Sequence, residues 1–151
     1  MPQACPISFY RIDTNSVRLI ALQVTLLSLA FLLTHEIIFA LILLFDFSIR
    51  TLRLAQFSPL HKISTFILQT FKVTAKLSDE APKRFALYLG FMASFLLLFS
   101  SLGGFILFST SITIILLVCA LLETLFDYCI GCKIYYAIQL LKGLFNHGRN
   151  I

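Results

Sequence analysis

The sequence predicts an all-α, multi-pass membrane helical bundle of four transmembrane helices, with one or two interfacial amphipathic helices. Composition is the first reason: of 151 residues, 59% are hydrophobic and only 13% are charged. A soluble domain carries about 25% charged residues, and so short a chain cannot bury this much apolar side chain in water. Disorder is excluded as well, because it needs low hydrophobicity and high charge. The other two reasons are the length of the apolar runs and the distribution of basic residues.

Four apolar runs are long enough, or nearly long enough, to cross a bilayer. A spanning helix needs about 20 mainly apolar residues. The predicted spans cover about residues 17–33, 36–53, 85–102 and 105–126, within a single integral-membrane domain, 1–151. Asp13, Thr14 and Asn15 are capping residue types just before the first span. The polar start of the chain lacks the basic region and cleavage site of a secretory signal, so the first run is expected to remain as a span.

Two further segments are predicted to be helices at the membrane interface. Residues 60–77 place apolar side chains at roughly helical spacing, with Lys62, Lys72 and Lys76 between them. An amphipathic helix packed on the bundle itself fits this pattern equally well. Residues 133–145 are apolar with Lys142 near the end, which indicates a short C-terminal helix.

The basic residues predict the orientation in the membrane. Short loops rich in Lys and Arg stay in the cytoplasm. All 12 Lys and Arg residues fall at one end of the four predicted spans, and the turns at His35-Glu36 and Gly103-Gly104 contain no Lys or Arg. We therefore expect both termini and the segment between the second and third spans to be cytoplasmic. The basic residues lie beside apolar runs, where they can contact anionic lipid headgroups, and no nucleic-acid motif accompanies them. The predicted partner is therefore the lipid bilayer and not nucleic acid.

The cysteines are the clearest chemical signal. Cys119 lies inside the fourth span as a small apolar residue, whereas Cys5, Cys129 and Cys132 fall at one predicted membrane face. A CxxC pair can close a disulfide, and the motif can lower the pKa of one thiol. A cytoplasmic location argues against a permanent disulfide and leaves transient redox chemistry, sulfur carriage or metal binding. The alternative is a reduced and idle pair; no metal and no cofactor is predicted.

Charged residues inside the spans are the second signal. Asp46 and Arg50 are four residues apart on one helix, and so are Glu123 and Asp127. Acids in a membrane are costly and usually have a partner in the bundle interior. The candidate cations are Arg18, Arg50, Lys83 and Arg84. These groups form either a polar pocket under the cysteines or a buried ion network that sets the register of the helices.

Several short motifs follow one another in a recognisable order. They are Cys5-Pro6, Asp13-x-Asn15-x-x-Arg18, Asp46-Phe47-x-x-Arg50, Ser58-Pro59-Leu60, Pro82-Lys83-Arg84-Phe85-Ala86 with Gly90, Leu122-Glu123, and Cys129-x-Gly131-Cys132-x-x-Tyr135. This pattern resembles a bacterial membrane family catalogued as domain of unknown function 4395. The resemblance implies a multi-pass protein of the bacterial inner membrane and carries no established reaction. It strengthens the grouping of one site, made of Cys5, Cys129, Cys132, Asp46, Arg50, Lys83, Arg84 and Glu123.

The leading hypothesis is thiol–disulfide or sulfur handling at the cytoplasmic face. One thiol of the Cys129/Cys132 pair attacks a disulfide or sulfane-sulfur donor, and the other resolves the mixed species. Basic side chains, namely Arg50, Lys83 and Arg84, favour the thiolate or hold an anionic substrate. The expected partner is a thioredoxin-like or sulfur-carrier protein. The alternatives are a non-enzymatic accessory or scaffold subunit and small-anion transport by an oligomer. Phosphate-loop and hydrolase signatures do not occur in the chain.

Overall fold

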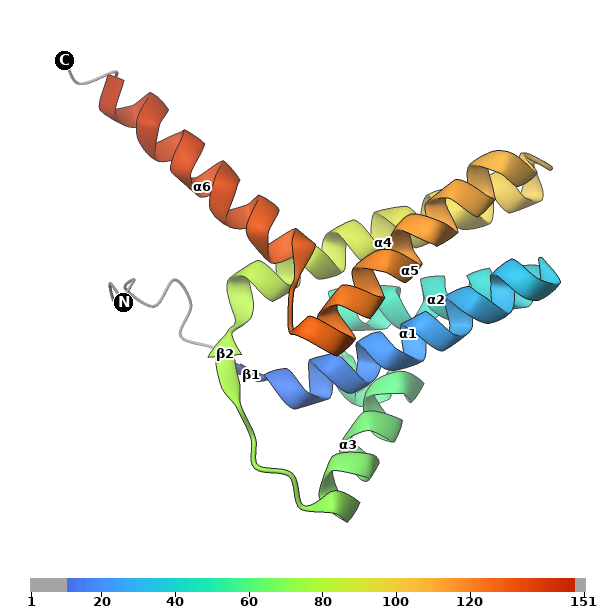
Figure 1. The fold of residues 1–151 in the computed structure, drawn as a ribbon, viewed down its shortest axis with the longest axis horizontal. Coiled ribbons are helices and arrows are strands. Elements are labelled where there is room, and N and C mark those ends of the chain that lie inside the picture. The colour runs from blue at the N-terminus through green and yellow to red at the C-terminus, as the bar shows by residue number, and fades with distance from the viewer. Residues whose placement is uncertain (1–10, 149–151) are drawn as a thin grey trace.

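Helices make up most of the computed structural model, which describes residues 11–148 (Figure 1), so the predicted all-α class is confirmed. In chain order the elements are β1 (Arg11–Asp13), α1 (Thr14–Thr34), α2 (Ile37–Thr51), η1 (Ala55–Phe57), α3 (Pro59–Phe71), β2 (Leu77–Asp79), α4 (Glu80–Leu102), α5 (Ile106–Phe126) and α6 (Ile130–Gly148).

Four helices, α1, α2, α4 and α5, form the bundle. Helix α1 packs against α2 and α5, and α4 packs against the same two helices, so the order around the bundle is α1, α2, α4, α5. Tight turns join α1 to α2 and α4 to α5, helped by left-handed backbone at His35 (φ 53°) and Gly104 (φ 75°). Both turns lie at one end of the bundle, called the turn end below (Figure 1). The opposite end, called the loop end, carries β1, β2 and the start of α6.

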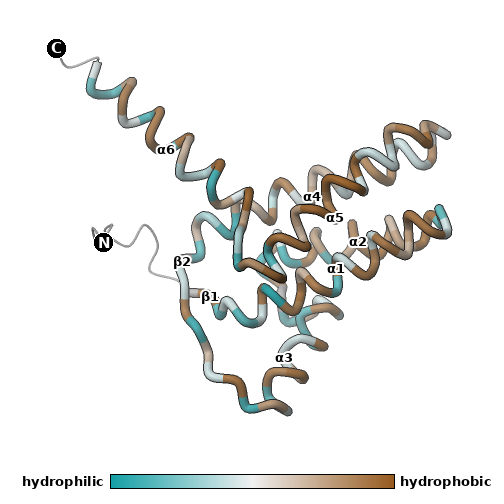
Figure 2. Tube along the Cα trace, viewed as in Figure 1, coloured by the Kyte–Doolittle hydropathy of each residue, from teal (hydrophilic) through white to brown (hydrophobic). Residues whose placement is uncertain are grey.

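Many large apolar side chains of the bundle are exposed, as a bilayer requires. Hydrophobic residues predominate along the bundle helices (Figure 2). Helices α1, α4 and α5 have 21, 23 and 21 residues and are long and apolar enough to cross a membrane. These features fit an integral membrane protein. Helix α2, in the segment 36–53, has only 15 residues, or about 22 Å at 1.5 Å per residue. It ends early because the chain breaks into η1 after a left-handed residue, Arg53 (φ 62°).

Small polar side chains line the inside of the bundle beside large apolar ones. Phe31, Leu43 and Leu97 are fully buried, and so are Ser94 and Thr113. Each of these two hydroxyls donates a hydrogen bond of 2.8 Å to the carbonyl four residues earlier. Small residues with satisfied hydroxyls let helix backbones approach closely without leaving a polar group unpaired in lipid.

The segment after α3 differs from the predicted helix over 60–77. Helix α3 ends at Phe71, where Lys72 takes a left-handed conformation (φ 48°). Residues 77–79 instead form β2, which pairs with β1 in antiparallel register, Ile12 opposite Ser78. Asp13 stabilises this junction, because its Oδ1 accepts the N–H groups of both Asn15 and Lys76 at 3.1 Å.

Helices α4 and α6 begin earlier than predicted. Helix α4 begins at Glu80, before the predicted start at residue 85. Pro82 lies in its first turn, where a missing N–H breaks no helical hydrogen bond. Helix α6 covers Ile130–Gly148, beyond both ends of the predicted range 133–145.

The bundle makes a topological prediction. Three variants each keep a single cysteine, with every other cysteine changed to Ser. Glu36→Cys and Phe105→Cys place that thiol in one of the two turns, and the third variant retains native Cys132. We expect a membrane-impermeant maleimide to label both from the same side of the membrane and native Cys132 from the opposite side. Intact and opened cells provide the comparison. Labelling of the two turns from opposite sides would contradict the paired-hairpin arrangement.

Candidate functional site

The Cys129/Cys132 pair lies at the start of α6, at the loop end. Cys129 immediately precedes the helix, and its Sγ accepts a hydrogen bond of 3.3 Å from the backbone N–H of Cys132. The thiol therefore occupies the capping position of a helix N-terminus, where free N–H groups and the helix dipole favour a negative charge. Both cysteines are half-buried and free, so each thiol is available for reaction.

The two thiols differ in acidity. Hydrogen bonding from Cys132 lowers the pKa of Cys129, although burial and the neighbouring Glu123 carboxylate oppose this effect. The same hydrogen bond raises the pKa of Cys132, with burial acting in the same direction. Cys129 is consequently the thiol that ionises first, and Cys132 keeps its proton. This asymmetry is what a nucleophilic and a resolving thiol require.

A close contact between α6 and α4 positions the pair. Gly131, between the two cysteines, lies directly against Ala86. A Cβ built on Gly131 would fall 2.6 Å from the Cβ and 2.7 Å from the Cα of Ala86. Only glycine permits this approach, because the Cα of Ala86 belongs to the α4 backbone and has no rotamer to change.

An apolar pocket of about 390 Å³ adjoins Cys129. Its walls come from α1, α2, α4, α5 and the first turns of α6. Most of the lining is apolar. Five lining side chains are polar or ionisable: Arg50, Lys83, Cys119, Glu123 and Cys129. The pocket therefore joins a reactive thiol and charged groups to an apolar interior.

Glu123 is the least satisfied of these groups. Its carboxylate is buried, and Oε2 has no hydrogen-bond partner among the described residues. Lys83 and Arg18 are the cations whose charges act on it. Lys83 Nζ donates to Thr14 Oγ1 at 3.3 Å, while the Arg18 guanidinium donates to the Thr124 carbonyl at 2.9 and 3.2 Å. Both cations are thus held near Glu123 without pairing directly with it.

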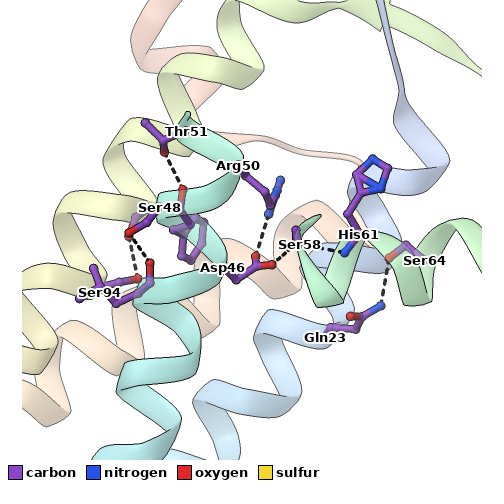
Figure 3. Close-up of polar contacts among 12 residues, drawn as sticks. Gln23, Asp46, Ser48, Arg50, Thr51, Ser58, His61, Ser64 and Ser94 are labelled. Atoms are coloured by element: carbon purple, nitrogen blue, oxygen red, sulfur yellow. Dashed lines mark hydrogen bonds and ion pairs between the residues drawn. The ribbon is translucent and has the colours of Figure 1, made fainter. Parts of the chain in front are cut away.

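Asp46, by contrast, is fully partnered (Figure 3). It is completely buried on α2, accepts the Ser58 hydroxyl, and lies 3.5 Å from Arg50 Nη1. Ser58 also accepts the His61 backbone N–H at 3.2 Å, which caps the start of α3. Burial, reinforced by the Arg50 charge, lowers the pKa of the His61 side chain. This cluster ties α2 to α3 and holds Arg50 at the edge of the pocket.

The structure thus brings together some of the residues that the sequence grouped. Arg50, Lys83, Glu123 and Cys129 line one pocket, with Cys132 one helical turn away. Asp46 contacts the site only through Arg50.

Arg84 belongs elsewhere, and Cys5 lies outside the described residues. Arg84 pairs with Glu80 at 3.1 Å and donates to the Thr51 carbonyl at 3.3 Å, and it does not line the pocket. Its neighbour Lys83 points differently because successive residues on a helix face different directions. Among residues 11–148, no group of three His, Cys, Asp or Glu side chains is arranged to hold a metal ion.

Sequence reasoning offered a polar pocket under the cysteines as one of two readings, but it missed the apolar walls of the pocket and the contact between α4 and α6. Ala86 and Gly131 stood in the recognised motifs, but nothing in one sequence shows that two small residues touch. A glycine inside CxxC was the available signal, since glycine in a helix is unfavourable without a packing reason.

Gly131→Ala tests the α4–α6 contact. The added Cβ must push α6 away from α4, so we expect a loss of about 1–3 kcal/mol in the free energy of unfolding. Alkylation of Cys129 should also become slower, because the displaced α6 no longer holds its N-terminus at the Cys129 sulfur. Gly143→Ala on the same helix is the matched control, since its Cβ meets open space, and it should be neutral or stabilising by up to about 1 kcal/mol. Denaturant unfolding in detergent gives the comparison, and equal effects of the two substitutions would refute the assigned role of Gly131.

Comparison with known proteins matches the chain to one family model. No curated protein and no solved structure matches the chain. The family described as Domain of unknown function (DUF4395) matches residues 12–139, a range that contains every residue lining the pocket. The chain belongs to this family.

Proposed function

We propose that the protein carries out thiol–disulfide exchange at the loop end of a membrane helical bundle, with Cys129 as the nucleophile and Cys132 as the resolving thiol. One observation carries the proposal: Cys129 Sγ occupies the N-terminus of α6 and accepts the Cys132 N–H at 3.3 Å. A lowered pKa at Cys129 and a raised pKa at Cys132 support this division of roles.

The exchange proceeds in two displacement steps. The Cys129 thiolate attacks one sulfur of a partner's disulfide, the partner's S–S bond breaks, and its other sulfur leaves as a thiolate. That thiolate takes the proton of Cys132. The Cys132 sulfur then attacks Cys129 Sγ, which closes the Cys129–Cys132 disulfide and releases the partner's second thiolate. Two electrons have passed to the partner. In the reverse direction, the Cys129–Cys132 disulfide accepts two electrons from a partner's dithiol and oxidises it to a disulfide.

The charged groups around the pocket modulate this chemistry. Lys83 favours an anionic sulfur at the pair, while Glu123 disfavours one on Cys129. Arg50 adds a second cation at the pocket wall. We propose that these groups adjust how readily the thiolate forms and leaves.

A soluble protein of the thioredoxin-like or sulfur-carrier class is the proposed partner. The concentration of basic residues at the loop end supports a cytoplasmic location of the cysteines, at the inner membrane of a bacterium. Asp127 and Tyr128, which precede the pair, are exposed to solvent. A partner arriving from the aqueous side therefore meets the cysteines at the surface of the bundle.

The projecting helix α6 favours a second candidate, a non-enzymatic accessory subunit. Beyond its first turns α6 extends away from the bundle (Figure 1), and no residue of this helix is buried. Leu140, Leu144 and Phe145 are large apolar side chains on this segment and are exposed. Such a helix suits a binding surface for another membrane subunit.

Separate cysteine substitutions test the exchange. We expect Cys129→Ser to abolish reduction of a soluble disulfide by the prereduced protein. Cys132→Ser should retain attack but stop at a mixed disulfide, which is visible as a mass adduct on Cys129. The matched control is Ser111→Ala, at an exposed position of α5 that does not line the pocket, which should react like the native chain. Full activity of a Cys129/Cys132 double variant would favour the accessory-subunit candidate.

Glu123→Gln tests the electrostatic control of Cys129. The groups acting on this thiol are Glu123 on α5 and Cys132 on α6, with Lys83 on α4 nearby. A carboxylate raises the pKa of Cys129, so its removal lowers that pKa, and the rise of alkylation rate with pH should move to lower pH. Mass spectrometry of iodoacetamide-treated samples measures the profile. Asp127→Asn is the control with little expected shift; an upward shift for Glu123→Gln would contradict the arrangement.

A further inference from the structure

We propose that the pocket beside Cys129 binds a lipid-soluble quinone, which accepts two electrons from the reduced Cys129/Cys132 pair. The inference rests on the proposed exchange function, because it supplies the second substrate of the same dithiol. Four features support it: an apolar interior, an opening toward lipid, cations at the reactive end, and the electron count of the reaction.

The interior of the pocket suits an apolar ring. Ile20, Val24 and Leu116 are buried residues of its walls, and Ala93 and Ala120 leave room between them. Its volume of about 390 Å³ lies in the range of about 300–1,000 Å³ typical of small-molecule sites. A water-soluble ion or nucleotide would leave its polar groups unsatisfied against these walls.

The pocket also reaches the outer surface of the bundle. Leu89 on α4 and Ile115 on α5 line it, yet they are 42% and 62% exposed. Both belong to the helices that are long enough to span a membrane, so their exposed sides face lipid. A molecule dissolved in the bilayer can therefore enter between these side chains, with an isoprenoid tail left among the acyl chains.

The reactive end of the pocket carries charges suited to a quinone. Arg50 and Lys83 line the pocket together with Cys129. Asp46 holds Arg50, and Thr14 accepts a hydrogen bond from Lys83, so both cations are positioned before a ligand arrives. Preorganised cations stabilise the negative charge that develops on a quinone oxygen during reduction. A lipid acyl chain would contact the apolar walls but would make no interaction with these cations.

The electron and proton balance closes with a quinone. The Cys129 thiolate adds to a ring carbon and forms a C–S bond, and the ring oxygen becomes anionic. The Cys132 sulfur then attacks Cys129 Sγ, the C–S bond breaks, and the Cys129–Cys132 disulfide forms. The released hydroquinone takes one proton from Cys132 and one from water, replacing the proton that Cys129 lost on ionisation. One dithiol and one quinone thus give one disulfide and one hydroquinone.

The experiment uses the full-length, prereduced protein in lipid nanodiscs with ubiquinone or menaquinone bearing one isoprenoid unit. Hydroquinone formation is followed by ultraviolet absorbance, and disulfide formation by mass after alkylation. We expect one hydroquinone per dithiol in the native chain and none with Cys132→Ser. Ala93→Phe, which fills the pocket, should slow quinone reduction by about tenfold or more while exchange with a soluble disulfide continues. Met92→Phe, on an exposed neighbouring residue, is the matched control and should change the rate by less than about twofold.

The outcomes separate this inference from the function on which it rests. Exchange with a soluble disulfide but no quinone reduction overturns the quinone inference and leaves the exchange function intact. Loss of both reactions in the native chain overturns both. Should Ala93→Phe fail to fold, a photoreactive azidoquinone on the native chain replaces it. Crosslinks to buried pocket residues such as Leu116 and Ala120 support the site. Crosslinks confined to exposed side chains on the lipid-facing side of the bundle, as for a bulk lipid, refute it.

Discussion

The contact between Gly131 and Ala86 is the constraint on which the candidate site depends. It lets the first turn of α6 lie directly on α4, with backbone atoms closer than any side chain would permit. Cys129 thereby reaches the pocket, and the helix N-terminus is aimed at its sulfur. The dipole, the hydrogen bond from Cys132 and access to the pocket are therefore consequences of one close approach of two helices.

Charge is distributed unevenly within the loop end. Asp46 is enclosed by a hydroxyl donor and Arg50, an arrangement that removes any need for a further ligand. Glu123 has cations nearby but keeps an oxygen without a hydrogen bond among the described residues. A buried cluster with complete partners stabilises a packing arrangement, whereas incomplete partners beside a reactive thiol favour chemistry. The two acids, alike in sequence, therefore have different roles in the proposed mechanism.

Local signals predicted local structure well. Asp13 caps α1 as its residue type indicates, and the turns fall at His35 and near Gly103-Gly104, where apolar runs are interrupted. The end of α3 could not be predicted, because β2 forms by pairing with a strand more than 60 residues away. Arg84 was grouped with Lys83 as a candidate cation, yet adjacent helical residues point to different neighbours, and Arg84 pairs with Glu80.

The sequence by itself determined the all-α class, the apolar exterior and the end of the bundle that carries the basic residues, because each follows from composition and from spacing along one chain. Only the tertiary structure decided which charged residues meet and that a pocket lies between them. Contacts such as Gly131 with Ala86 or Arg18 with Thr124 join distant segments. They depend on how helices cross and rotate, which is set by the packing of all the helices together and not by any one segment.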